Sequence, residues 1–460
     1  MKSIKIFNIK SLAFVFALML MATSCSQWID YDLNTDPDAP ADVPMNLLLP
    51  AIEQSMGYNL VGNNTVRTTN IWAQQFDGTD RQSFTEARYA LRSTDINNPW
   101  TSIYTEMLMN SKLLINKAET EGVESPNFKG VGQVLIATTL GIATDLWGDM
   151  PFSKAFKGSE NVLNPEYDSQ QKIYDTIFTI LDNAIVNLSN TQNAISISGD
   201  VIYGGNTSKW KKAAASIKAR HALQLSGPNG SAAYTQALAA VANGFTSNDD
   251  DMLVPWETAN KGPIFQFMEE RGDIRMGATL INMLASNNDP RLPFYAEKDG
   301  DGNYTGSEAG SENTAASPPG SYNAGATAPS VLMSYTELKF IEAEAKLMLG
   351  QSGAQEAYEA AVAASVLRVT GSTNTAWLDA NINGIPVTLQ TLIEQKYIAC
   401  YSTNQPYSDY RRTGFPVLSL ANGAVTGSIP TRFPYPQSEL DYNTQNVPSV
   451  IITDKVWWDQ

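Results

Sequence analysis

The sequence predicts a mainly α-helical protein whose helices pack as antiparallel pairs of the tetratricopeptide type. Apolar residues recur at helical spacing through many segments, whereas the strict alternation of a half-buried strand is scarce. Gly350 separates two of the helical segments, and a helix, a glycine stop and a second helix are typical of an antiparallel pair. No clean repeat of roughly 34 residues accompanies this pattern.

The predicted helices follow one another between recognisable start and stop signals. Their ranges are 99–121, 128–147, 169–188, 208–225, 232–243, 274–285, 332–349, 354–367 and 389–401. The 332–349 helix is apolar on nearly all sides apart from its charged positions, which predicts a helix packed between others. Irregular stretches are predicted between the helices, and loops of such length are usually functional or disordered; they are 60–98, 248–272, 289–329 and 412–460.

The N-terminus has the layout of a secretory signal. Three lysines precede an apolar run over 12–22 that is too short to cross a bilayer. Ala22, Thr23 and Ser24 then lead into Cys25, and small residues before a cysteine resemble the lipobox of bacterial lipoproteins. We therefore expect residues 1–24 to be a lipoprotein signal peptide, Cys25 to carry lipid, and residues 25–460 to form a single domain. An incidental cysteine behind an ordinary signal peptide is the alternative.

Composition argues against several functions. The formal net charge is −16, and loss of the three lysines would make it −19, which repels nucleic acid. The chain has one histidine, His221, so a multi-histidine metal site is excluded, and we expect neither metal nor cofactor. His221 lies in an apolar helical stripe and Cys400 in an apolar helix. We interpret both as core residues rather than catalytic groups.

Candidate ligand-binding residues come from the irregular stretches. Sugar recognition needs flat aromatic faces together with amides, carboxylates or arginines, and such groups belong on loops held by a rigid scaffold. The stretch "NIWAQQFDGTDRQSFTEARYAL" is the richest in these groups, and later loops add others. The predicted ligand-binding residues are Trp72, Gln74, Gln75, Asp80, Arg81, Tyr89, Trp256, Arg271 and Tyr322.

Two other motifs are interpreted as structural. "DGDGNYTGSE" has a calcium-loop beginning, but Tyr304 stands where the loop needs glycine and Gly310 where it needs glutamate, so a tight polar turn is expected. "DYRRTGFP" and "PTRFPYP" contain arginines beside prolines and aromatic residues. We expect Arg411, Arg412 and Arg432 to form bidentate pairs with carboxylates such as Glu342, Glu344 or Glu394.

Several segments, in order along the chain, resemble the SusD/RagB family of nutrient-binding outer-membrane lipoproteins of Bacteroidetes. They are "LNTDPDAP", "DLWGDMPFSKAF", "SKWKKAAASIKARHALQLSG", "FIEAEAKLMLG", "IEQKYIACYSTNQPYSDYRRTGFP" and "IPTRFPYPQSELDYNTQN". The resemblance spans essentially the whole chain after the leader. It departs at Tyr407, where many members of the family carry tryptophan, although an aromatic residue is retained.

The resemblance implies four tetratricopeptide-like helix pairs that support a large, irregular, loop-rich ligand-binding region. It also implies a lipid anchor in the outer membrane and exposure at the cell surface. Such a protein binds oligosaccharide nutrients, does no chemistry and delivers its ligand to a SusC-like TonB-dependent transporter. A peptide-binding member of the same uptake system is the alternative.

The residues also bear on two other functions. A secreted all-α glycoside hydrolase needs two carboxylates about 5–10 Å apart across the scissile bond. Glu342 and Glu344 stand two positions apart on a predicted helix and therefore point in different directions. A pure assembly protein would use its helix pairs only to hold the transporter.

Overall fold

The computed structural model describes residues 43–120 and 122–460. The chain divides into two units, Met1–Pro44 and Met45–Gln460, and the account below concerns the second. The predicted signal peptide and Cys25 lie outside the described residues. Within the described ranges, no helix combines the length and the apolar character that a membrane span requires.

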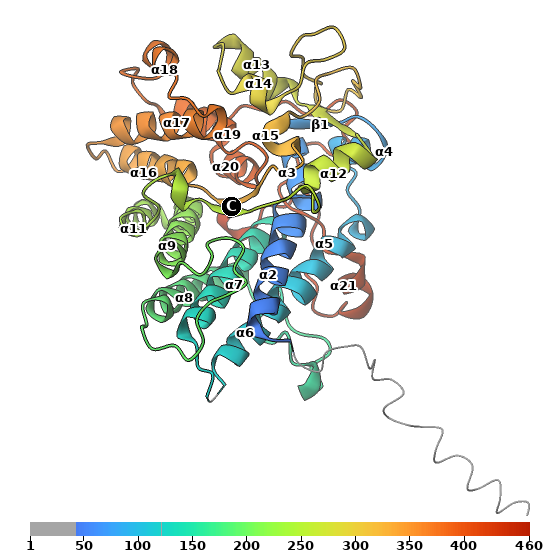
Figure 1. Cartoon of the computed structure of the whole chain (residues 1–460). Helices are drawn as coiled ribbons and strands as arrows, with labels where there is room; N and C mark the ends of the chain where they lie inside the picture. The colour runs from blue at the N-terminus through green and yellow to red at the C-terminus, as the bar shows by residue number, and fades with distance from the viewer. Residues whose placement is uncertain (1–42, 121) are drawn as a thin grey trace, which may run out of the picture. The chain divides into compact units, whose positions relative to one another are not determined.

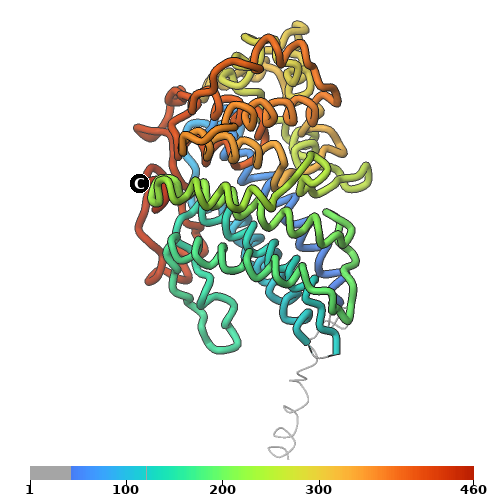
Figure 2. Tube along the Cα trace, turned by 90° about the vertical axis from the view of Figure 1, so that its left-hand side faces the viewer, coloured from blue at the N-terminus to red at the C-terminus, as the bar shows by residue number. Residues whose placement is uncertain are grey.

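The scaffold of the second unit is a series of helices that pack against one another largely in chain order (Figures 1 and 2). Each neighbour in the series contacts the next, and the prediction of a mainly α fold is confirmed. The series comprises α6 (Met109–Ala118), α7 (Pro126–Trp147), α8 (Gln170–Leu188), α9 (Thr207–Gln224), α11 (Ser231–Val241), α16 (Tyr335–Met348), α17 (Ala354–Thr370) and α19 (Leu389–Ala399).

The predicted helix, glycine stop and second helix are present as α16 and α17. Gly350 adopts the left-handed conformation (φ +63°) that lets the chain reverse after α16. The two helices then bury a shared apolar cluster that includes Phe340, Val362 and Leu392. Burial of this cluster holds α16, α17 and α19 together.

Shorter elements connect and cover the scaffold. They are α2 (Met45–Ser55), η2 (Met56–Leu60), α3 (Asn64–Trp72), α4 (Arg81–Ala87), η3 (Ser93–Ile96), α5 (Asn97–Thr101), η4 (Ser102–Leu108), η5 (Gly158–Glu160), α10 (Ser226–Asn229), η6 (Asn248–Asp250), α12 (Pro263–Glu270), α13 (Ala278–Ser286), α14 (Leu292–Tyr295), α15 (Ser321–Ala324), α18 (Thr375–Asn381), α20 (Gln405–Thr413), α21 (Gln437–Tyr442) and η7 (Trp457–Asp459).

Two small antiparallel sheets join distant parts of the chain. In the first, β1 (Phe76–Gly78) pairs with β3 (Ile274–Met276), with Phe76 opposite Met276. In the second, β2 (Met252–Val254) pairs with β4 (Ser330–Met333). Each sheet thus ties a predicted irregular stretch to a distant segment: β1 of 60–98 to β3, and β2 of 248–272 to β4.

The prediction that 60–98 is irregular is wrong, because this stretch contains α3, β1 and α4. The helix α3 lacks a clear apolar stripe because polar side chains such as Thr69 and Asn70 occupy part of its buried side. Thr69 Oγ1 donates to Asn404 Oδ1 (3.0 Å), and Asn70 Nδ2 donates to the Thr403 carbonyl (2.8 Å). Buried polar groups are tolerated when they are hydrogen-bonded. In α3 they stand at positions where an apolar residue would have indicated a helix.

Two predicted helices begin too early. The range 274–285 opens with strand β3 and continues as α13, and 332–349 opens with the end of β4 before α16. Ser334 then caps α16, since its side chain accepts a hydrogen bond from the Glu337 amide. Short apolar runs do not distinguish a strand from a helix, which explains both errors.

His221 and Cys400 are core residues, as predicted. His221 is 1% exposed, and neither ring nitrogen has a hydrogen-bond partner among the described residues. Burial, with a smaller effect of the neighbouring Arg220 charge, lowers the pKa of His221 to about 3. Cys400 is also buried, and burial raises the pKa of its thiol. Neither group is poised for acid, base or nucleophilic chemistry.

The expected arginine–carboxylate pairing is confirmed for one arginine. Arg412 donates to both carboxylate oxygens of Glu344 and to Asp409 Oδ1 (2.9 Å). For Arg411 and Arg432 the expectation is wrong. The carbonyls of a helix's last turn have no hydrogen-bond partner within the helix. Both arginines donate to such carbonyls at the end of α7: Arg411 to that of Asp145 and Arg432 to that of Trp147.

The remaining carboxylates of that expectation have other partners. Glu342 accepts hydrogen bonds from Lys339 and Lys346, and Glu394 accepts one from Gln390. The expected polar turn at Asp299 is confirmed. Its carboxylate accepts hydrogen bonds from the Asn303 amide (2.8 Å) and Thr305 Oγ1 (2.8 Å), and these bonds lower its pKa.

Candidate functional site

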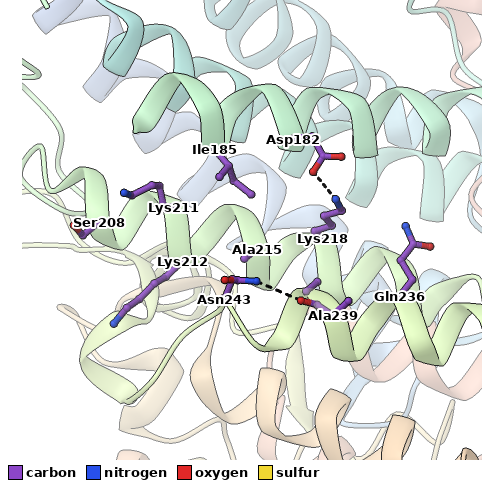
Figure 3. Close-up of a pocket in the computed structure, with 11 residues that line it drawn as sticks. Asp182, Ile185, Ser208, Lys211, Lys212, Ala215, Lys218, Gln236, Ala239 and Asn243 are labelled. Atoms are coloured by element: carbon purple, nitrogen blue, oxygen red, sulfur yellow. Dashed lines mark hydrogen bonds and ion pairs between the residues drawn. The ribbon is translucent and has the colours of Figure 1, made fainter. Parts of the chain in front are cut away.

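A groove of about 630 Å³ lies between α8, α9 and α11 (Figure 3). Three lysines of α9 reach it, but two of them have carboxylate partners: Lys218 pairs with Asp182, and Lys212 pairs with Asp250 at 2.8 Å. Alanines form much of the rest of the wall. Since two of its three lysines are already paired and alanines form much of its wall, this groove is a weaker candidate for ligand binding than a cavity with a polar wall.

A second cavity, of about 380 Å³, has a strongly polar wall, and we call it the asparagine pocket. Its residues come from η2, α3, α4, η3 and α5, which follow one another along the chain. The lining residues are Asn59, Asn63, Asn64, Arg67, Gln82, Thr94, Asp95, Asn98 and Pro99. Neutral amides dominate this wall, and amides both donate and accept hydrogen bonds.

Arg67 organises one side of the asparagine pocket. Its guanidinium lies 3.8 Å above the ring centre of Phe267, and its Nε donates to Asn63 Oδ1 at 3.3 Å. Burial lowers the pKa of Arg67, and the nearby Glu86 carboxylate opposes this effect. Because the Asn63 oxygen is occupied, its amide nitrogen is left to donate to a ligand.

Gln82 offers the pocket an acceptor, whereas Asn63 offers it a donor. Its Nε2 donates to Glu86 Oε1 at 2.9 Å, which leaves the Gln82 carbonyl oxygen as an acceptor. Glu86 itself is buried, and burial raises the pKa of its carboxyl. The pocket therefore presents a donor at Asn63 and an acceptor at Gln82, each oriented by a buried charged residue.

The far wall comes from η3 and α5. Asp95 accepts hydrogen bonds from the Arg92 backbone amide (2.9 Å) and guanidinium (3.1 Å), so its carboxylate is held in place. Asn98 is exposed, and its side chain forms no hydrogen bond with the rest of the described chain. An unengaged amide at the mouth of a polar pocket is available to a ligand.

Three predicted ligand-binding residues meet beside the asparagine pocket. Asp80 caps α4 and lies 3.3 Å from Arg81 Nε. Arg81 Nη1 is 3.6 Å from Asp273 Oδ1, and Arg271 Nε donates to Asp273 Oδ2 at 3.0 Å. Gln82 follows Arg81 directly, so the cluster adjoins the pocket wall.

Four other predicted residues from the same stretch are packed inside the protein. Trp72 is fully buried and donates to the Glu86 carbonyl at 3.0 Å. Gln75 donates to the Tyr397 carbonyl, Gln74 to the Ser419 carbonyl, and the Tyr89 hydroxyl accepts from the Ala421 amide; the distances are 2.6, 2.5 and 3.2 Å. These side chains position the strand β1 and its flanks.

Trp256 and Tyr322 lie apart from the asparagine pocket. Trp256 is 5% exposed and donates to Ser330 Oγ at 2.9 Å. Tyr322 belongs to an aromatic group with Tyr295, which it contacts edge to face, and Tyr401; the ring centres are 5.1 and 6.5 Å away. The structure therefore separates the predicted set into an exposed charged cluster, five buried packing residues and the half-buried Tyr322.

Sequence reasoning missed the pocket residues Asn63, Arg67, Gln82, Asp95 and Asn98. A signal was present, because asparagines recur in "GYNLVGNNT" and "INNPW" on either side of the predicted binding stretch. Clustered amides are less conspicuous than tryptophans, but they are the groups that bind hydroxyls. As for metals, the described residues contain no group of three or more His, Cys, Asp or Glu side chains that could hold one.

The fold and the pocket together define a class of helical proteins in which stacked helices support a polar pocket built from short elements. The chain belongs to the SusD-like family, described as starch-binding and associating with the outer membrane, whose profile matches residues 37–436. No significant match was found among curated proteins.

Several solved structures are similar to this chain. A SusD/RagB family protein from Bacteroides thetaiotaomicron is 24% identical, with a TM-score of 0.79 over 91% of this chain and 99% of the other. A chitin-binding protein is 28% identical, with a TM-score of 0.79 over 90% of this chain and all of the other (100%). A chitin-binding SusD homolog from Flavobacterium johnsoniae is 24% identical, with a TM-score of 0.78, covering 90% and 98%.

Proposed function

We propose that this protein is a lipid-anchored protein of the outer-membrane surface that binds an oligosaccharide nutrient in the asparagine pocket. It delivers this ligand, unaltered, to a SusC-like TonB-dependent transporter. The observation that carries the proposal is the paired polarity of the pocket, with Asn63 as donor and Gln82 as acceptor. Sugar hydroxyls both donate and accept, so they match such a wall. The family description and the chitin-binding relatives support a glycan.

Asp80, Arg81 and Arg271 are proposed as the rim of this site. Arg81 and Arg271 pair with Asp273 beside the pocket, and Asp80 pairs with Arg81. All three side chains are partly or largely exposed, so they are accessible to the outer sugars of a chain. For Trp72, Gln74, Gln75, Tyr89, Trp256 and Tyr322, direct ligand contact stays a prediction.

Binding without turnover is tested with the purified full chain. Maltohexaose and chitohexaose are titrated calorimetrically, and each sugar is then recovered and sized by mass spectrometry. We expect one of them to bind and to be recovered intact. Shortened sugars would contradict the proposal, as would binding only to a mixture of hexapeptides.

The lipid anchor is tested at Cys25. We expect the full chain to fractionate with outer membranes and to incorporate a labelled fatty acid, and Cys25→Ala to abolish both. The neighbouring Ser26→Ala is the matched control and should leave both unchanged. An unlabelled wild-type chain in the soluble fraction would contradict the anchor.

Delivery to a transporter is tested by cross-linking on intact cells that make the tagged full chain. We expect an outer-membrane TonB-dependent barrel among the cross-linked products. Its absence, in cells that still take up the sugar through such a barrel, would contradict the delivery step and leave binding untouched.

A further inference from the structure

Another cavity, of about 410 Å³, lies among α13, α17 and α19 and the segments after α18 and α20. We call it the α17–α19 cavity. It shares no lining residue with the asparagine pocket, and Figure 1 shows its helices grouped at one end of the second unit. Its volume falls within the range of about 300–1,000 Å³ that is typical of small-molecule sites.

The wall of the α17–α19 cavity favours a neutral ligand. Amide, hydroxyl and aliphatic side chains line it, and Glu394 is its one charged lining residue within the described chain. Because no lysine or arginine reaches the surface of the cavity, an anionic ligand would lie unneutralised beside a carboxylate. Neutral groups that form hydrogen bonds fit this wall.

Gln395 is a fixed donor in this cavity. Its Oε1 accepts a hydrogen bond from Arg291 Nη2 at 2.9 Å, and Arg291 is fully buried and paired with Asp289 at 2.6 Å. The Gln395 amide nitrogen forms no hydrogen bond with the described residues. The buried ion pair therefore orients the amide so that its nitrogen is available to a ligand.

Glu394 and Gln390 form an acceptor beside it. Gln390 Nε2 donates to Glu394 Oε1 at 2.8 Å, which leaves Glu394 Oε2 to accept from a ligand hydroxyl. Gln390 and Glu394 are four positions apart on α19, where side chains are neighbours, and Gln395 follows Glu394 directly, so the acceptor and the donor share one helix.

Tyr358 of α17 supplies a third polar group. The residue is 5% exposed, and its hydroxyl forms no hydrogen bond with the described residues, although it lines the cavity. Burial raises the pKa of Tyr358 to about 12, so the hydroxyl keeps its proton and can donate. A hydroxyl that lines the cavity without a protein partner is free to bond to a ligand group.

Aliphatic side chains complete the cavity. Ile385 and Val417 line it and remain 47% and 77% exposed. Ligand pockets typically combine apolar side chains with a few oriented polar groups. The C–H face of a sugar ring would cover these side chains while its hydroxyls reach Gln395, Glu394 and Tyr358.

From these contacts we infer that the α17–α19 cavity is a second binding site, for a neutral sugar residue. The sugar class rests on the proposed function, whereas the cavity itself requires a neutral ligand with neighbouring hydrogen-bonding groups. Two separate sites on one chain hold a long polysaccharide at two points. Such a protein retains polymers more tightly than short fragments because the second contact is intramolecular.

The test counts binding sites with short probes that occupy one site at a time. Maltotriose and chitotriose are titrated into the full chain by equilibrium dialysis. We expect two bound molecules of the preferred probe per wild-type chain. Tyr358→Phe combined with Glu394→Gln should reduce this to one, and Tyr234→Phe, on α11 and outside both cavities, should leave it at two.

The outcomes separate this inference from the proposed function. One site in the wild type that resists the double variant but weakens in Asn98→Ala overturns the second site and retains the asparagine pocket. One site that is lost in the double variant and unaffected by Asn98→Ala supports the α17–α19 cavity and contradicts the asparagine pocket. If the double variant does not fold, Glu394→Gln alone, at a partly exposed position, carries the same test.

Discussion

Gly141 in α7 lies directly against the ring of His221 in α9. A Cβ at position 141 would be 2.1 Å from Cε1 and 2.2 Å from Nε2 of His221, much closer than side-chain atoms approach. The absence of a side chain at 141 therefore lets α7 and α9 approach closely enough to bury the ring. His221 in turn contacts the edge of Tyr174 from α8, with ring centres 5.6 Å apart.

We expect Gly141→Ala to destabilise the protein by about 1–3 kcal/mol through overpacking. Alanine gains up to about 1 kcal/mol of helix propensity, but the clash with a buried ring outweighs it. Denaturant unfolding monitored by circular dichroism measures the change. Gly158→Ala is the control, because no atom lies within 4 Å of a Cβ there. Equal midpoints for both variants would contradict the contact.

The buried imidazole makes stability depend on pH. The unfolded His221 gains a proton near pH 6.5, whereas the folded residue stays neutral down to about pH 3. The unfolded state thus binds more protons in this window. The stability due to neutral His221 is complete above pH 6.5 and is lost as pH falls toward 3, by about 1.4 kcal/mol per pH unit.

The measurement compares the wild type with His221→Phe, which cannot titrate. Between pH 7.5 and pH 5, the wild type should lose about 2 kcal/mol more unfolding free energy than the variant. Buried carboxyls such as Asp145 titrate in both proteins, so the difference isolates the histidine. Parallel pH profiles would show that His221 does not carry the effect.

The Arg412–Glu344 pair is expected to be sensitive to loss of one partner. Both side chains are at most 3% exposed. Arg412→Met removes a positive charge that neutralises the buried carboxylates of Glu344 and Asp409. We expect the free energy of unfolding, measured in urea, to fall by about 3–5 kcal/mol. Lys154→Met, which breaks the exposed pair with Glu166, should cost about 1 kcal/mol or less. Similar losses in both variants would refute the distinction.

In the asparagine pocket, Asn98→Ala is expected to weaken sugar binding about 3–10-fold, the effect of one or two neutral hydrogen bonds. Stability should not change, because the Asn98 side chain has no partner in the described chain. Isothermal titration with the preferred hexasaccharide measures the change. Gln236→Ala, in the groove of Figure 3, is the matched control and should bind as the wild type does.

Helical periodicity located most of the scaffold because amphipathic spacing is a local property. The range predicted as 128–147 is α7 to within two residues, and 354–367 lies within α17. The same rule failed at α3, whose buried Thr69 and Asn70 find partners near position 404, far along the chain. Hydrogen bonds to residues far along the chain produce no helical spacing of apolar residues in the local sequence.

The candidate site was less predictable than the fold. The predicted stretch contributes Gln82 to the asparagine pocket, but the prediction favoured aromatic residues such as Trp72 and Tyr89 that prove to be interior. An aromatic side chain in a polar run serves equally well as core or as binding surface, and only burial distinguishes the two. The amides of Asn63 and Gln82 gain their fixed polarity from Arg67 and Glu86, which is a tertiary relationship.

The sequence by itself determined that the chain is mainly helical, that His221 and Cys400 are interior, and which family it resembles. These properties follow from spacing, composition and motif order, which are readable in one dimension. Only the tertiary structure decided which polar side chains face a cavity, and with which partners. Orientation and solvent access depend on groups that are distant in the chain, so they exist only once those groups have been brought together.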